Sequence, residues 1–116
     1  MRLRDLIDLL HCEVVGEPDV PESLEFHTCF AADLMSDVLA YSWAGALLIT
    51  GLASVQSAHT ADVADLAAIL YVAGKRPDGA VRELARRKGI PLLTTPYSMF
   101  EACGMLYGAG WKGASR

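Results

Sequence analysis

The sequence predicts a single α/β domain whose sheet is mainly parallel, has about four or five strands and is flanked by helices. Apolar runs of strand length alternate with helical patterns from about residue 46 onward, and the links between them are short. This alternation is typical of right-handed crossover units on a parallel sheet. The chain has 116 residues, of which 53% are hydrophobic and 21% charged, so it holds enough apolar material for one folded core.

The N-terminal part of the chain is expected to contain one helix and two strands. Apolar residues repeat at helical spacing near the N-terminus and would form one buried stripe: Leu3, Leu6, Ile7 and Leu10. Residues 12–16 and 24–32 are rich in residues that favour strands. The segment 17–23 between them holds two prolines and several acids, so we expect a surface loop there.

A short helix over 34–43 is expected next, with Asp33 as its cap. Residues 46–50 (ALLIT) form a continuous apolar run, which is the pattern of a strand covered on both faces. The loop after this strand starts at Gly51, and we expect Ser54 to cap the helix that follows.

The second half of the chain is expected to repeat this order. Residues 67–74 form another apolar run of strand length. A helix then starts at Pro77-Asp78 and ends at Gly89, because glycine readily takes the left-handed conformation that stops a helix. Residues 90–94 are the next predicted strand.

The last predicted helix runs to about Tyr107, and the sequence leaves its start open. Thr95-Pro96 could supply the cap and the first helical residue, or Ser98 with Glu101 could form a capping box one turn later. Residues 1–107 are therefore assigned to the domain, and the glycine-rich residues 108–116 are expected to form a flexible tail.

A ligand site is expected at the carboxyl edge of the sheet, where loops lead from strands into helix N-termini. The three loops concerned are 50–56, 74–78 and 94–98. Hydroxyl groups and free backbone amides there could hold a small polar or anionic molecule. The candidate ligand-binding residues are Thr50, Gly51, Ser54, Gln56, Thr94, Thr95 and Ser98.

Each of these loops also has a purely structural interpretation. Ser54 and Ser98 could do no more than cap their helices, and the cations Lys75 and Arg76 could be ordinary solvated loop charges. The stretch 45–51 is not a phosphate-binding Walker loop, because its spacing differs and no lysine followed by serine or threonine is present.

Two segments of the chain are distinctive: AAILYVAGKRPDGAVRELARRKGIPLLTT (67–95) and ADLMSDVLAYSWAGALLITG (32–51). Together they resemble the DRTGG domain family, and the likeness extends over most of residues 1–107. Members of this family are small free-standing proteins or regulatory modules of phosphotransacetylases and of CBS-containing inorganic pyrophosphatases. Their fold is similar to the N-terminal domain of HPr serine kinase/phosphatase and of the Mur ligases.

The resemblance implies a non-catalytic domain that senses a ligand or dimerises, in some members in connection with adenine nucleotides. The chain departs from the family at one point, because it lacks the Asp-Arg-Thr-Gly-Gly run that gives the family its name. The loop matched to that run, residues 51–56, carries no charge. Without the arginine, phosphate recognition at this loop loses its strongest donor.

Other catalytic and metal-binding constellations are not favoured. The residues His11, Cys12, His27 and Cys29 lack the spacing of a metal site. On one helix the trio Ser57, His59 and Asp62 would not converge as a hydrolase triad, and Asp33 with Asp37 is better explained by capping and solvation than by acid–base work.

Charge and composition bear on partners and location. The net charge is −4 and the sequence pI about 5.2, with one basic cluster at 86–88 where a helix is expected to end, so we do not expect nucleic-acid binding. We expect no membrane span and a cytoplasmic location with reduced cysteines. The aromatic residues Tyr41, Trp43 and Trp111 and the alanine-rich helix after Ser54 favour a homodimer.

The sequence thus predicts a regulatory domain rather than an enzyme. We expect it to dimerise, to bind a small ligand such as an adenine nucleotide and to inform a partner enzyme, with no cofactor and no metal. The alternative is a purely structural interaction module without a ligand.

Overall fold

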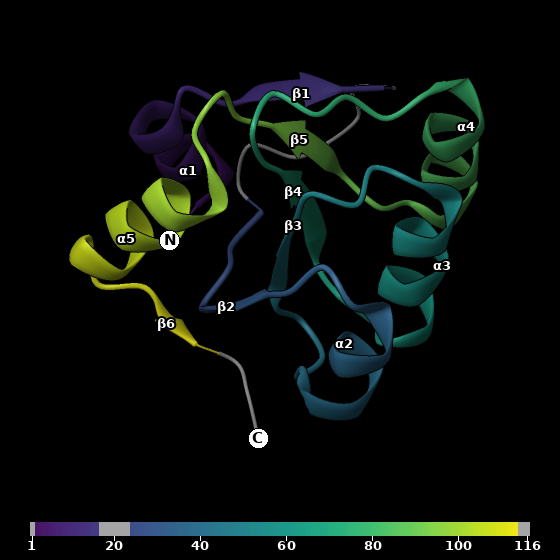
Figure 1. Cartoon of the computed structure of the whole chain (residues 1–116), viewed down its shortest axis with the longest axis horizontal. Coiled ribbons are helices and arrows are strands. Elements are labelled where there is room, and N and C mark those ends of the chain that lie inside the picture. The colour runs from purple at the N-terminus through teal and green to yellow at the C-terminus, as the bar shows by residue number, and fades with distance from the viewer. Residues whose placement is uncertain (1, 17–23, 114–116) are drawn as a thin grey trace.

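The computed structural model describes residues 2–16 and 24–113. These residues form one sheet of six strands, with helices on both of its faces (Figure 1). The strands are β1 (Glu13–Val15), β2 (Thr28–Ala31), β3 (Leu47–Thr50), β4 (Ala68–Tyr71), β5 (Leu92–Thr94) and β6 (Lys112–Gly113). The helices are α1 (Leu3–Leu10), α2 (Met35–Tyr41), α3 (Val55–Val63), α4 (Gly79–Lys88) and α5 (Met99–Gly108).

The strand order in the sheet is β1-β5-β4-β3-β2-β6. All neighbouring pairs are parallel except β1 with β5, which places the antiparallel strand at one edge. The mainly parallel α/β fold predicted from the alternating pattern is therefore confirmed, with a strand count slightly above the expected one. The added strand is β6, which is too short to produce a periodic signal.

Two apolar cores lie on the two faces of the sheet. Side chains of Leu48, Ile69 and Leu92 pack with α2, α3 and α4, whereas the adjacent residues on β3 and β5, Leu47 and Leu93, pack with α1 and α5. Figure 1 shows the two helix layers on either side of the sheet. Strands covered on both faces bury every residue, which explains their continuous apolar runs.

Local signals set the boundaries of the last two long helices. The Asp78 carboxylate accepts hydrogen bonds from the amides of Ala80 and Val81 at the start of α4, and Gly89 ends that helix at φ 70°. At the start of α5 the capping box of Ser98 and Glu101 is formed. Of the two starts that the sequence left open for this helix, the structure has the later one, at Ser98.

Asp33 differs from the expectation, since it does not cap α2. The N-cap of α2 is Leu34, without a side-chain cap, and the Asp33 carboxylate instead accepts hydrogen bonds from the β3–α3 loop. Capping was inferred from local sequence alone, but α2 follows β2, so Asp33 stands beside the end of the neighbouring strand β3 and finds its donors there.

The residues after α5 also differ from the expected flexible tail. Trp111 is 5% exposed and stacks at a tilt against Phe26, and β6 then pairs with β2. The burial of one large side chain provides the contact that holds this glycine-rich segment against the sheet. The loop expected at 17–23 and residues 114–116 lie outside the described residues. In the described part of the chain, no helix has the length and apolar character needed to cross a membrane.

Candidate functional site

The three loops predicted to carry a ligand site lie along one edge of the sheet. Strands β3, β4 and β5 are parallel neighbours, so their carboxyl ends meet at the same edge. Backbone hydrogen bonds join the loops that follow: the amide of Val72 donates to the carbonyl of Thr50, and the amide of Gly74 donates to the carbonyl of Thr95. We call this edge, formed by the loops after β2, β3, β4 and β5, the carboxyl rim.

Asp33 occupies the first donors of the β3–α3 loop. Its Oδ1 accepts a hydrogen bond of 3.0 Å from the Thr50 hydroxyl and one of 2.7 Å from the Gly51 amide. A side chain on residue 51 would begin 3.5 Å from the same oxygen, so the carboxylate lies directly against the glycine. The chain thus supplies its own anion at the point where the loop leaves the strand.

The hydroxyls of the β5–α5 loop hold the backbone in place. Thr94 Oγ1 donates to the carbonyl of Lys75 at 2.7 Å, and Thr95 Oγ1 donates to the carbonyl of Leu10 at 2.7 Å. The Ser98 hydroxyl is engaged in the α5 capping box. These three candidates are therefore on the carboxyl rim, as predicted, but each already has a partner within the protein.

Ser54 and Gln56 are the two candidates whose side chains have no hydrogen-bond partner among the residues that the structure describes. Ser54 is the N-cap of α3, yet its side chain makes no capping hydrogen bond. Among the described residues, its Oγ is buried and has no hydrogen-bond partner. Gln56 lies exposed in the first turn of the helix. An orphaned hydroxyl at a helix N-terminus places an unused hydrogen-bonding group beside backbone amides and the positive end of the helix dipole.

A buried hydroxyl pair supports this turn from below. Ser57 Oγ lies 2.7 Å from the hydroxyl of Tyr71 at the end of β4, and it also donates to the carbonyl of Ser54. Burial raises the pKa of Tyr71, and the hydrogen bond with Ser57 offsets part of that rise. The pair fixes the first turn of α3 to the sheet.

The three residues that superficially suggest a hydrolase triad lie in different environments: Ser57, His59 and Asp62. Ser57 is buried against Tyr71, His59 is exposed, and the Asp62 carboxylate lies 3.5 Å from Lys88 Nζ. They form no catalytic triad. No group of three or more His, Cys, Asp or Glu side chains that could hold a metal ion occurs in residues 2–16 and 24–113.

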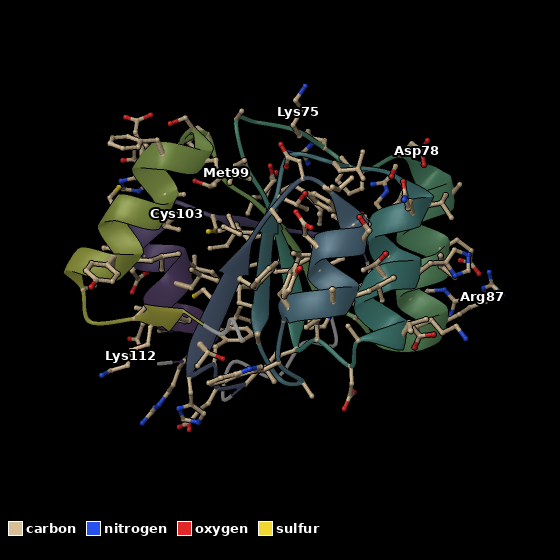
Figure 2. All side chains as sticks on the ribbon, turned by 60° about the horizontal axis from the view of Figure 1, so that its bottom comes forward. Lys75, Asp78, Arg87, Met99, Cys103 and Lys112 are labelled. Carbon is tan, nitrogen blue, oxygen red and sulfur yellow. The ribbon has the colours of Figure 1, made fainter. Side chains whose placement is uncertain are left out.

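The cations near the carboxyl rim have different environments. Arg76 forms an ion pair with Glu13 of β1. Lys75 has no ion pair with any residue that the structure describes, and Figure 2 shows its side chain pointing away from the body of the protein. Lys75 is therefore the cation of this loop that remains available to a ligand.

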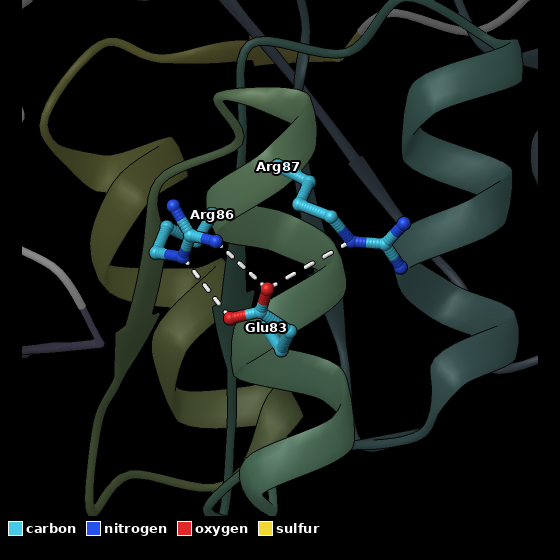
Figure 3. A network of polar contacts seen from close by, with 3 residues as sticks. All are labelled: Glu83, Arg86 and Arg87. Carbon is cyan, nitrogen blue, oxygen red and sulfur yellow. Dashed lines mark hydrogen bonds and ion pairs between the residues drawn. The ribbon is translucent and has the colours of Figure 1, made fainter.

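The basic cluster on α4 is paired with carboxylates of α4 and α3. Glu83 Oε1 lies 2.7 Å from Arg86 Nη2 and 3.9 Å from Arg87 Nε, as drawn in Figure 3. The hydrogen bond with Arg86 lowers the pKa of Glu83. The third cation, Lys88, is paired with Asp62 of α3. These pairs account for the cluster as helix and interhelix electrostatics.

The match to a family model agrees with the geometry over nearly the whole chain. A model of the DRTGG domain matches residues 5–109, a span that runs from α1 to the end of α5. The chain belongs to the DRTGG domain family. The resemblance drawn from the segments 32–51 and 67–95 is thereby confirmed, although the Asp-Arg-Thr-Gly-Gly run is absent.

A solved structure has the same fold as this DRTGG domain. It contains the CBS and DRTGG domains of the regulatory region of Clostridium perfringens pyrophosphatase, complexed with the activator diadenosine tetraphosphate. The TM-score is 0.73 at 18% sequence identity, with 90% of this chain and 45% of that chain covered. The chain therefore spans less than half of that structure, and the likeness concerns the fold. No curated relative matches the chain.

Sequence reasoning missed two features of the carboxyl rim. The first is Asp33, for which a signal existed: an acid directly after a strand that ends beside Thr50. The second is the Ser57–Tyr71 pair, which joins residues 14 positions apart and has no local signature.

Proposed function

We propose that this DRTGG domain is a non-catalytic regulatory module that binds a small anionic ligand at the first turn of α3. The ligand is of the adenine nucleotide class, and the domain informs a partner enzyme of its presence. The observation that carries the proposal is the Ser54 hydroxyl, which is buried and unpartnered among the described residues at the N-terminus of a nine-residue helix.

The physical chemistry of this turn favours an anion. Leaving a buried hydroxyl without a partner costs about 1–3 kcal/mol, and a ligand oxygen placed against it would recover part of that cost. Free amides of the first turn add further donors, and the helix dipole favours negative charge there. Exposed Gln56 would contact the outer part of such a ligand, as would Lys75 of the adjoining loop, which has no ion pair within the described residues.

Asp33 limits where the ligand can lie. Because its carboxylate holds the Gly51 amide, the negative groups of a ligand would be repelled from Gly51 and directed toward Ser54. Thr50, Thr94 and Thr95 then act through the shape of the carboxyl rim, since their hydroxyls are engaged with Asp33, Lys75 and Leu10. The diadenosine tetraphosphate complex of the related regulatory region supports the nucleotide class.

A homodimer is the second part of the proposal. Large apolar side chains are exposed on and beside α2, at the edge of the helix layer: Leu34, Leu39, Tyr41 and Trp43. We call this set the α2 patch. Exposed apolar patches of this kind mark protein contact surfaces. Trp111, which the sequence also favoured for a contact surface, is buried within the domain and takes no part.

A thermal-shift experiment tests the ligand. The domain is heated with ATP, ADP, AMP and diadenosine tetraphosphate at saturating concentration. A ligand at about 100 times its Kd stabilises the folded state by about 2.7 kcal/mol, which corresponds to a rise in Tm on the order of 10 °C for a domain of this size. The variant Ser54→Ala should lose most of this rise.

The matched control is Ser36→Ala, since Ser36 is exposed on α2. It should keep the full shift. No rise in Tm with any nucleotide would overturn the sensor role and leave the structural interaction module as the function. An unchanged rise in Ser54→Ala would show that the ligand binds elsewhere.

A further inference from the structure

A pocket lies on the face of the sheet opposite to α3, between α5 and the strands β2 and β6. Its volume is about 270 Å³, and none of the seven candidate residues of the carboxyl rim lines it. Figure 2 shows Cys103 on α5 and Lys112 on β6 on this side of the molecule. The lining residues that matter here are Cys29, Ile49, Cys103, Leu106, Trp111 and Lys112.

Apart from Lys112, the residues that line the pocket carry no charge, and most of them are apolar. Ile49 and Leu106 offer hydrocarbon surface, and Cys29 and Cys103 add two thiols, whereas the Phe30 side chain packs against the core on the other face of the sheet. Burial, with the neighbouring Cys103 as a smaller cause, raises the pKa of Cys29 to about 12, so this thiol stays protonated at physiological pH. Such a wall suits the uncharged body of a small organic molecule.

One charge stands at the pocket. Lys112 is the charged side chain among the lining residues, it is exposed, and it forms no ion pair with any residue in the described part of the chain. Trp111 also lines the pocket, while its Nε1 is itself buried and has no partner among the described residues. A cation at the pocket of an acidic protein complements one negatively charged group.

We propose that this pocket binds a small organic carboxylate. Its apolar body lies between α5 and β2, and its carboxylate pairs with Lys112 Nζ. The volume admits a single aromatic ring or a short aliphatic chain, whereas a nucleotide with several phosphates would need more than one cation. The site lies on the opposite face of the sheet from the first turn of α3, so it does not depend on the function proposed above.

The two tryptophans allow a direct test. Trp43 is half exposed beside α2, and Trp111 lines the pocket. In the variant Trp43→Phe, Trp111 is the remaining tryptophan and its indole N–H gives a single resonance in a nitrogen–proton NMR spectrum. Phenylacetate is the probe, and 2-phenylethanol is its neutral counterpart. Phenylacetate should shift the resonance saturably, with a Kd about three to five times lower than that of 2-phenylethanol.

Charge and volume are then tested separately on the same background. Lys112→Gln should remove the preference for phenylacetate, while the matched control Lys88→Gln, on α4, should keep it. Cys103→Phe should fill the pocket and abolish the shift; if this variant fails to fold, Cys103→Met is used, with an expected loss of affinity. Absence of a saturable shift with both probes at millimolar concentration would overturn the pocket as a ligand site. Equal affinity for the two probes, or an unchanged preference in Lys112→Gln, would overturn the assignment of a carboxylate.

Discussion

Asp33 shows how a single side chain organises the carboxyl rim. This exposed residue follows β2 in the chain. Its carboxylate accepts two hydrogen bonds, one from the end of β3 and one from the loop beyond it. The loop 51–56 has no charged residue of its own, and the negative charge against its first amide comes from a residue 18 positions earlier.

Removing this carboxylate should destabilise the domain. In Asp33→Ala the Gly51 amide and the Thr50 hydroxyl lose their acceptor, and we expect a loss of about 1–2 kcal/mol in the free energy of unfolding, moderated by solvent at this exposed position. Urea denaturation measures it. Asp33→Asn keeps an acceptor oxygen and should retain part of the stability. Asp8→Ala on α1 is the control and should change little; an equal loss in both alanine variants would contradict the role of the rim contact.

Helix α5 has one buried side, one exposed side and a glycine in its middle. Its inner side packs Ala102 and Leu106 into the core with α1, while its outer side exposes Phe100 and Tyr107 at 87% and 80%. Gly104 stands in the middle of the helix with no atom near the position of a Cβ. Gly104 is therefore required neither by a turn nor by a closely packed neighbour. Its low helix propensity lowers the stability of α5, and no contact within the described part of the domain compensates for this.

Two glycine substitutions test whether Gly104 weakens α5 and whether Gly89 is required at the end of α4. Gly104→Ala should raise the free energy of unfolding by about 0.8–1 kcal/mol, because alanine has the better helix propensity and meets no neighbour. Gly89→Ala at the end of α4 should lower it by about 1–2 kcal/mol, because φ there is 70°. Chemical denaturation of both variants measures whether the free energy of unfolding rises in the first and falls in the second, as expected. A loss of stability in Gly104→Ala would indicate that this position contacts another chain.

At the scale of the whole molecule, the sheet separates two surfaces with different properties. The carboxyl rim and the helices α2, α3 and α4 carry the turn proposed for the nucleotide and the α2 patch, whereas α1 and α5 cover the face with the pocket. The α2 patch adjoins the same layer as α3. Under the proposed function, a ligand at the first turn of α3 would act on the proposed contact between two copies through the packing of α2 against α3.

The homodimer is tested by the mass of the protein in solution. Light scattering after size exclusion should give about twice 12.5 kDa for the unmodified chain, with dissociation on dilution. Trp43→Lys places a charge in the α2 patch and should shift the protein to the monomer by weakening association about 100-fold or more. Val63→Lys, at an exposed position of α3 outside the patch, is the control. A mass of one chain at every concentration would exclude the dimer.

Local sequence determined the elements of this protein, because periodicity and caps depend on residues a few positions apart. The apolar stripe of α1, the buried runs of β3 and β4, and the stop at Gly89 all followed from such patterns. The fold class and the common edge of the three ligand loops followed in turn, because parallel crossovers bring the carboxyl ends of strands together. Membership of the DRTGG family could also be stated from two segments.

The partners of the polar groups on that edge were decided by the tertiary structure alone. Thr95 bonds to a carbonyl 85 residues away and Asp33 to the neighbouring strand, so neither side chain could be assigned from its own surroundings in the sequence. The same reason explains Trp111 and β6, where a buried indole and pairing with β2 order residues that look like a loose tail. Propensity acts over a few residues, while hydrogen-bond satisfaction and burial depend on whichever distant groups the fold brings near.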